Sequence, residues 1–233
     1  MSITVTLATS AEERAQLHRF RYSVYVEEMG RRPTHANPVD RTLTDPLDAA
    51  ACNFIALDGG RVIGALRANL GRDSDFGPYS SLYQMERAGR WYPDHVSMTS
   101  RFMIAPDYRG TSVGMRLILA CFELGVERDV YFDFMDTNRH LEALYTRFGY
   151  VPYRGRVIHP EFGDVLPMVL NLTDTQHLES VGSPYVRVRR HQPWIGVPIA
   201  FPNAGPIGSE PVDGLDSTQP GRSSAASPAM TWS

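Results

Sequence analysis

The alternation of apolar and polar residues along the chain predicts short strands separated by amphipathic helices. Residues 3–7 alternate apolar side chains with Thr, which is the period of a strand that buries one face. Apolar residues recur at steps of three and four after Ser10, Ser112 and Asn138, which predicts a helix at each place. Further runs predict a short helix at 82–88 and strands at 53–57, 62–66, 96–105, 130–135 and 165–172. This order is typical of an α/β fold in which a mixed central sheet is flanked by helices on both faces.

The first predicted helix carries charges on its apolar side. A capping box begins the helix at Ser10, and its apolar stripe includes Phe20 and Val24. At about 100° per residue, Arg21 and Glu28 fall on the same side as this stripe. Two opposite charges there are either an ion pair at the border of the stripe or the lining of a polar cavity, and the residues alone leave both interpretations open.

The chain divides by composition into three parts. Residues 1–172 hold the predicted strands and helices, with Gly30 to Pro46 as a loop of the length that often binds ligands. Residues 173–201 form a predicted extension packed on this domain, in which Val and Arg alternate at 186–189. At 202–233 Pro, Gly, Ser and Ala dominate without any period, which predicts a disordered tail.

Composition and charge exclude several classes of function. The 233 residues carry a net charge of −3, which argues against a general attraction to nucleic acid. All 23 basic residues are arginine, so a lysine Schiff base and a Walker-type phosphate loop are excluded. The two cysteines, Cys52 and Cys121, lie in apolar runs and predict free thiols in a reducing compartment, with neither a disulfide nor a metal site. Since we find no signal peptide and no run of about 20 apolar residues, we expect a cytoplasmic protein without a membrane span.

A strand, a glycine-containing turn and a helix follow one another between Arg101 and Ala120. The strand ends before Pro106, the turn includes Gly110, and the helix begins at Ser112. This arrangement aims several backbone N–H groups at one point, with the positive end of the helix dipole behind them, and so predicts an anion site. A packing corner without any ligand would show the same pattern. A dinucleotide loop is excluded because G-x-G-x-x-G is absent.

The same turn resembles the pyrophosphate loop of the GNAT acyltransferase superfamily, R/Q-x-x-G-x-G/A. Arg109 and Gly114 match its outer positions, and Ser112 stands where the family has its middle glycine. A second stretch, 136–150, looks like the other GNAT signature, N-x-x-A-x-x-x-Y-x-x-x-G-F/Y, through Asn138, Tyr145 and Gly149. Two separate motifs in the family's order imply the GNAT fold for about residues 1–172.

The GNAT resemblance implies an acyl donor that is a thioester on a phosphopantetheine arm, from coenzyme A or from an acyl carrier protein. Backbone N–H groups of the loop would hold the phosphate, and the strand before it would pair with the arm. The implied donor-binding residues are Met103, Ile104, Arg109, Gly110, Thr111, Ser112, Val113, Gly114 and Asn138. Tyr145 would protonate the departing thiolate. Its alternative role is that of a core aromatic residue on the apolar stripe.

The N-terminal half resembles the acyl-homoserine-lactone synthases and the related N-acyl amino acid synthases. The segment 20–30 is similar to their R-x-x-V-F-x-E-E-x-G, and D-x-x-D, G-x-x-R and S-R-F follow in order at 45–48, 64–67 and 100–102. The matching positions imply Glu28 as a catalytic residue and, as substrate-binding residues, Arg21, Asp45, Asp48, Arg67 and Arg101.

Two positions depart from the pattern of the lactone synthases. Arg31 and Arg32 follow the first glycine, where those enzymes have a Trp, and Met98 stands where they have a Glu three residues before the strand arginine. Both positions concern the acceptor, so the departures weaken the case for S-adenosylmethionine. An acceptor resembling an amino acid remains, because its carboxylate suits an arginine fork and its ammonium suits an aspartate.

The sequence therefore predicts an N-acyltransferase that moves an acyl group from a phosphopantetheine thioester to the amine of a small amino-acid-like acceptor. Lactone synthesis, a generic acetyl-CoA N-acetyltransferase and a non-catalytic acyl-thioester sensor are the alternatives. We expect the acceptor to bind at one polar cluster beside the reactive end of the thioester, formed by Arg21, Glu28, Asp48, Arg67 and Arg101. The donor arm would enter between the strands at Ile104.

Overall fold

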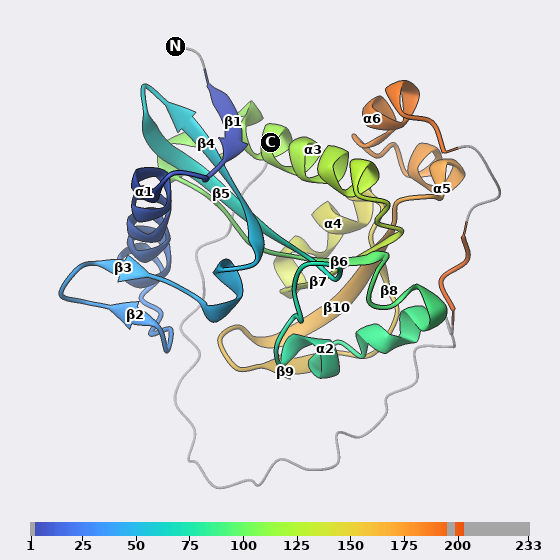
Figure 1. The fold of residues 1–233 in the computed structure, drawn as a ribbon, viewed down its shortest axis with the longest axis horizontal. Coiled ribbons are helices and arrows are strands. Elements are labelled where there is room, and N and C mark those ends of the chain that lie inside the picture. Colours follow the sequence, from blue (N-terminus) through green and yellow to red (C-terminus); the bar gives the residue numbers. More distant parts are fainter. Residues whose placement is uncertain (1–2, 195–198, 203–233) are drawn as a thin grey trace, which may run out of the picture.

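The computed structural model describes residues 3–194 and 199–202, which fold around one large sheet (Figure 1). The strands of this sheet are β1 Thr4–Leu7, β4 Ala51–Asp58, β5 Arg61–Leu70, β6 Val96–Ile104, β7 Phe132–Thr137, β8 Val151–Pro152, β9 Val157–His159 and β10 Gly163–Asn171. The helices are α1 Ala11–Tyr22, α2 Tyr79–Leu82, α3 Ser112–Glu127, α4 Glu142–Phe148, α5 Thr175–Ser180 and α6 Val186–His191. A π-helical turn, Ser23–Glu28, continues α1, and 3-10 turns occur at Pro46–Asp48, Met85–Trp91, Pro106–Tyr108 and Arg139–Leu141.

The sheet is mixed, as the sequence predicted. Its strand order is β1-β4-β5-β6-β7-β10-β8, and β9 pairs with β10 at the same edge. The neighbours are antiparallel except for β6 and β7, which run parallel because α3 carries the chain across the sheet between them. The prediction of a mixed α/β sheet flanked by helices is confirmed.

The two parallel strands separate after a short paired stretch. Their register runs from Val96–Phe132 through Met98–Phe134, whereas β6 stays paired with β5 as far as Ile104 and β7 with β10 as far as Thr137. A register shift on the β5 side, between Ala65 and Arg67, accompanies the divergence. The half of β6 beyond Met98 therefore has an edge that β7 does not use, and a wedge opens between the strands.

The strands β6 and β7 present different side chains to the two faces of the sheet, because successive residues alternate. One face packs on α3, with Met103 and Met135 in the larger apolar core. The other face carries Met98, Phe132 and Phe134 into a second core cluster with Tyr83 and Tyr153. The wedge thus joins two separately packed sides of the molecule.

The segment after β10 lies against α3 and the sheet. Tyr185 stacks on Phe122 of α3 with ring centroids 4.2 Å apart, and Arg189 donates from Nε to the carbonyl of Leu172 at 2.9 Å. Phe201 packs edge-to-face on Phe132, with centroids 5.1 Å apart. The division of the chain at residue 172 stays a prediction. The predicted disordered tail lies, from residue 203 on, outside the described residues.

Several local expectations need correction. The expected loop 30–46 contains a small hairpin of β2 Ala36–Asn37 and β3 Thr42–Leu43, and the expected helix at 138–148 begins with a 3-10 turn before α4. The alternating residues 186–189 form α6, where Val188 and Arg189 are both buried, so a pattern with the period of a strand belongs to a helix. The elements α5, β8 and β9 are too short for a periodic signal and were not predicted.

Gly149, predicted as the stop of its helix, takes a left-handed conformation at the end of α4, with φ of 107°. A Cβ there would lie 2.7 Å from Cδ2 of Leu178, so Gly149→Ala adds crowding to backbone strain. We expect the variant to lower the free energy of unfolding by about 2–3 kcal/mol in a urea titration. Gly163→Ala is the matched control, because φ is 71° but no atom lies within 4 Å of the new Cβ. Equal losses in the two variants would show that the contact with α5 is unimportant.

Candidate active site

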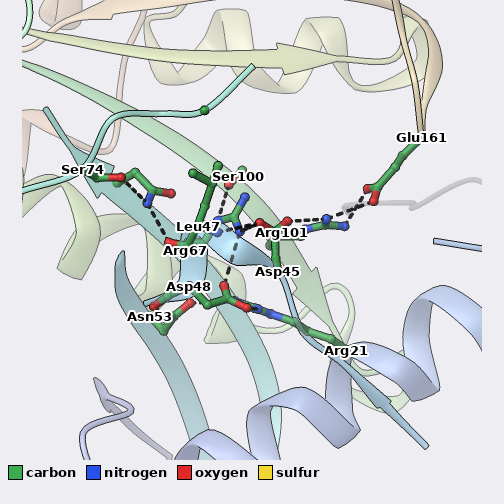
Figure 2. Close-up of polar contacts among 12 residues, drawn as sticks. Arg21, Asp45, Leu47, Asp48, Asn53, Arg67, Ser74, Ser100, Arg101 and Glu161 are labelled. Carbon is green, nitrogen blue, oxygen red and sulfur yellow. Dashed lines mark hydrogen bonds and ion pairs between the residues drawn. The ribbon is translucent and has the colours of Figure 1, made fainter. Parts of the chain in front are cut away.

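Three buried arginines and three acids form a single ion-pair cluster on the side of the sheet that faces α1 (Figure 2). Arg21 binds Asp48 at 2.7 Å, and Arg67 binds both Asp48 at 3.3 Å and Asp45 at 3.0 Å. Asp45 also binds Arg101 at 2.8 Å. Arg101 completes the cluster with a two-pronged contact to Glu161, at 2.8 and 3.1 Å.

The cluster is electrically balanced, and its arginines are almost fully buried. Arg21 and Arg67 are 1% exposed and Arg101 is 6% exposed. A buried charge is costly unless it is paired, so the three acids are needed for the arginines to lie there at all. Arg21 also donates to Asn53 at 2.6 Å and Arg67 to Ser100 at 3.0 Å, while Nε of Arg21 has no hydrogen-bond partner among the described residues. The cluster fixes α1, the turn at 46–48, β5 and β6 relative to one another.

Backbone geometry explains how Arg101 reaches this cluster. Strict alternation along β6 would place Ser100 and Phe102 on one face and Arg101 on the other. Instead Arg101 has a left-handed conformation, with φ of 54°, at the register shift between β5 and β6. The irregularity lets Arg101 and Ser100, both of the S-R-F motif, contact the same group of side chains.

The sequence prediction of this cluster needs one correction. Arg21, Asp45, Asp48, Arg67 and Arg101 come together, but Glu28 does not join them. The Glu28 carboxylate lies at the end of the π-helical turn and binds Arg109 of the predicted phosphate loop, at 2.6 and 2.8 Å. Glu28 therefore connects the N-terminal helix to the loop and leaves Arg101 to Glu161.

The predicted phosphate loop has the expected strand–turn–helix geometry, although several of its amides are already used. Thr111 caps α3 by accepting from the Val113 N–H, while the N–H groups of Arg109 and Thr111 donate to the carbonyls of Pro106 and Tyr108. The first-turn N–H groups of an α-helix have no carbonyl partner within the helix. In the candidate donor site, the first-turn N–H groups that Thr111 does not cap are those of Ser112 and Gly114.

Arg109 itself lies at the wide end of the wedge, where β6 ends. Its Nε donates to the carbonyl of Ile104 at 3.1 Å, so this side chain covers part of the strand that was predicted to pair with the donor arm. Met103 and Ile104 are buried and pair with Ala65 and Gly64 on the β5 side. Their other edge faces the wedge.

An apolar cavity of about 150 Å³ extends from the wedge into the core beneath α3. Its lining extends from Tyr25, Arg101 and Phe162 to Cys121, Gly125 and Leu172. Apolar cavities of this size admit ligands about as large as benzene. Tyr145 and Asn138 of the second motif both line it. Tyr145 is enclosed by aromatic neighbours, and burial raises the pKa of its hydroxyl, which therefore keeps its proton.

A smaller pocket lies on the opposite side of the wedge. It is lined by Arg67, Ser100, Arg101, Met98, Tyr79, Tyr83, His159, Phe162, Thr99 and Asp136. His159 stacks between Tyr79 and Phe162 and accepts two backbone N–H groups at Nδ1, at 3.0 and 3.1 Å. Burial and the nearby arginines lower the pKa of His159 to about 4, so its ring is neutral at pH 7. The pocket thus has aromatic walls and, from the ion-pair cluster, the side chains of Arg67 and Arg101.

Four side chains of this region were not predicted. Glu161 follows β9, in a segment without a motif or a periodic signal, and its distance in sequence from Arg101 hides the pairing. Asn53 and Ser100 lie in or beside predicted strands or motifs. The sequence feature that could have identified them is a polar residue within an apolar run. Asp136 opens the stretch of the second motif, two residues before Asn138, and borders both cavities.

Other kinds of site find no support in the part of the chain that the structure describes. No three His, Cys, Asp or Glu side chains gather there as a group that could hold a metal ion. Within the same residues, no helix combines the length and the apolar character needed to cross a membrane.

Comparison with known proteins places this geometry in a family. Residues 16–172 match the family model described as N-acyl amino acid synthase FeeM. The structure of FeeM from uncultured soil microbes is similar, with 13% identity, coverage of 73% of this chain and 92% of that chain, and a TM-score of 0.57. The acyl-homoserine lactone synthase BjaI, solved with SAM and isopentyl-CoA, gives 18% identity, coverage of 78% and 90%, and a TM-score of 0.58. The AHL synthase LasI gives 16% identity, coverage of 73% of this chain and 90% of that chain, and a TM-score of 0.58.

At these identities the structural likeness shows a common fold, and the expected GNAT fold is confirmed. No curated protein matches the sequence.

The ion-pair cluster makes the unfolding free energy depend on pH in the acid range. Burial raises the pKa of Asp45, but Arg67 and Arg101 outweigh it and lower this pKa from 3.8 to about 2. A lowered folded-state pKa gives stability that is present above about pH 4 and is lost as the pH falls through about 2. The shift corresponds to about 2 kcal/mol. We therefore expect the difference in unfolding free energy between the native chain and Asp45→Asn to shrink by about that amount between pH 5 and pH 2.

Asp94→Asn is the control for this titration, because Asp94 is exposed. A stability difference for Asp45→Asn that stays constant down to pH 2 would mean that the arginines do not stabilise the Asp45 carboxylate.

Proposed function

Because the chain belongs to the family of the N-acyl amino acid synthase FeeM, we propose how its two cavities serve the acyl transfer that this family performs. The chain is a GNAT-type acyltransferase that moves an acyl group from a thioester to an amine. We assign the apolar cavity to the acyl chain, the wedge between β6 and β7 to the thioester, and the smaller pocket to the acceptor. The single observation that carries this assignment is the wedge, since it joins an apolar cavity on one side to an arginine-lined pocket on the other.

The apolar cavity supports an acyl group longer than acetyl. Its volume of about 150 Å³ exceeds what a two-carbon chain fills, and its inner walls are mostly apolar. Each methylene buried there contributes about 0.8 kcal/mol, which is roughly a fourfold gain in binding. A generic acetyl-CoA N-acetyltransferase is less well supported for this reason.

The start of α3 supports the phosphate end of the donor. Ser112 and Gly114 lie in the first turn of α3, at the positive end of the helix, and Arg109 precedes them in the loop. Donor entry along β6 requires Arg109 to leave the carbonyl of Ile104, and an incoming phosphate offers its guanidinium a new partner. Coenzyme A and an acyl carrier protein present the same arm, so both are donor candidates. Cytoplasmic placement is part of the proposal, and the two free thiols support it.

The arginine side of the smaller pocket supports an acceptor that carries a carboxylate beside its amine, and the pocket itself, of about 20 Å³, takes only a small part of that molecule. Arg101 belongs to β6 at the edge of the wedge, but Asp45 and Glu161 use its donors in this structure. Glu161 is the more exposed of the two acids, with 18% of its side chain accessible against 8%. We infer that the acceptor's carboxylate takes the place of Glu161 on the Arg101 fork. Met98 lines this pocket at the position where the lactone synthases have a Glu. Lactone synthesis is therefore the weaker alternative.

The test is an assay of thiol release from acyl thioesters of two to twelve carbons with a panel of amino acids. We expect the longer acyl groups to exceed acetyl in kcat/KM, and the product to be an N-acyl amino acid by mass spectrometry. Arg101→Lys keeps the charge but removes the fork, and should raise the acceptor KM about ten- to a hundredfold with little change in the donor KM.

Arg156→Lys is the matched control, because Arg156 also holds two acids, Glu142 and Asp164, away from both cavities. Equal effects of the two variants on the acceptor KM would contradict the assignment of Arg101. If no thioester and amine pair gives an N-acyl product, the proposed function is wrong.

A further inference from the structure

Asp136 lies where the two cavities meet, and it lines both of them together with Thr99, Ser100, Arg101 and Phe162. It lies near the end of β7, two residues beyond the last pairing with β6, where the wedge has opened. Among the described residues, it is the acidic side chain that lines both the apolar cavity and the smaller pocket. A group in this position lies between the acyl chain and the acceptor.

The carboxyl group of Asp136 is only partly used. Tyr83 donates a hydrogen bond to it, while Oδ2 is shielded from solvent and has no partner among the described residues. A buried oxygen of this kind costs free energy unless a ligand supplies a donor. An ammonium or amine N–H is such a donor.

The other acids near the wedge are fully engaged. Asp45, Asp48 and Glu161 are held by the arginines of the cluster, and Glu28 is held by Arg109. Asp133, on the opposite face of β7, accepts from three hydroxyl groups, those of Ser97, Thr99 and Tyr150. The thioether of Met98, which lines the same pocket as Asp136, cannot take a proton. Asp136 is therefore the acid of this region with an oxygen left to bind a proton.

We propose that Asp136 is the general base that takes a proton from the acceptor's ammonium. The role rests on the N-acyl transfer proposed above. The amine that remains attacks the thioester carbonyl carbon, the C–N bond forms and the C–S bond breaks. The second proton of the nitrogen goes to the departing thiolate, and the Tyr145 hydroxyl is the group placed to pass it on. Asp136 returns its own proton to solvent, so one ammonium and one thioester give an amide, a thiol and one proton.

The environment of Asp136 suits this exchange. Burial raises its pKa to about 6, and the bond from Tyr83 and the charges of Arg101 and Arg31 limit the rise. The carboxylate is then ionised at pH 7, yet its basicity is closer to the working pH than that of an ordinary aspartate. The charged and titratable groups that face it are those of Tyr83, Tyr145, Tyr153, Arg31 and Arg101.

The experiment measures the pH dependence of kcat/KM for the acceptor in the full chain, with an acyl-CoA that the native protein uses. We expect kcat/KM to rise with pH through a midpoint near 6, because the ionised carboxylate is the active form. Asp136→Asn should lower turnover about 10²- to 10⁴-fold, remove this rise and leave the donor KM unchanged. Added imidazole or formate should restore part of the activity of Asp136→Asn, which a purely structural role would not allow.

Tyr83→Phe gives an independent readout in a variant that keeps the carboxylate. Since the Tyr83 hydroxyl lowers the pKa of Asp136, its removal should move the midpoint to higher pH. If native protein forms N-acyl product but Asp136→Asn keeps the native pH profile, Asp136 is not the base and the proposed function stands. If Tyr83→Phe leaves the midpoint unmoved, the titrating group is not Asp136. Absence of product from the native protein would remove both claims.

Discussion

The balance of three buried arginines against three acids is the constraint on which this structure depends. Arg21, Arg67 and Arg101 lie almost out of water, and each would be costly without its carboxylate partners. Buried ion pairs of this kind add little net stability over apolar side chains, but removing one partner leaves the other as an unpaired buried charge. Their effect is therefore geometric, because they hold α1, the turn at 46–48 and two central strands in one arrangement. The smaller pocket, to which we assign the acceptor, is built on that arrangement.

The wedge between β6 and β7 brings the ion-pair cluster next to the apolar cavity. Parallel strands normally stay paired along their length, and here pairing ends after Met98. The α3 side of the wedge is apolar and hollow, while the other side carries arginines and aromatic rings. In the proposed reaction, entry from the two faces keeps the acyl chain in the core and the charged acceptor in a polar pocket. Arg109 and Glu28 form an ion pair at the proposed donor end.

Much of this could be predicted from the sequence, because periodic patterns and motifs are local. The capping box at Ser10, the helix stop at Gly149 and most of the longer strands depend on neighbours within a few residues. The arginines and aspartates of the cluster could be found because they belong to recognisable motifs. Glu161 could not, since its pairing with Arg101 depends on where the hairpin of β9 and β10 lies in space. Glu28 was placed with the wrong arginine for a similar reason, because helix periodicity gives a side of the helix but not the partner across it.

A crystal structure with a non-transferable acyl-CoA analogue and an amino acid tests the central claim most directly. We expect the acyl chain in the cavity beneath α3, the arm between β6 and β7, and the amino acid carboxylate on Arg101 with Glu161 displaced. An acyl chain outside the cavity, or an amino acid bound away from Arg101 while the Arg101–Glu161 pair stays intact, would contradict it.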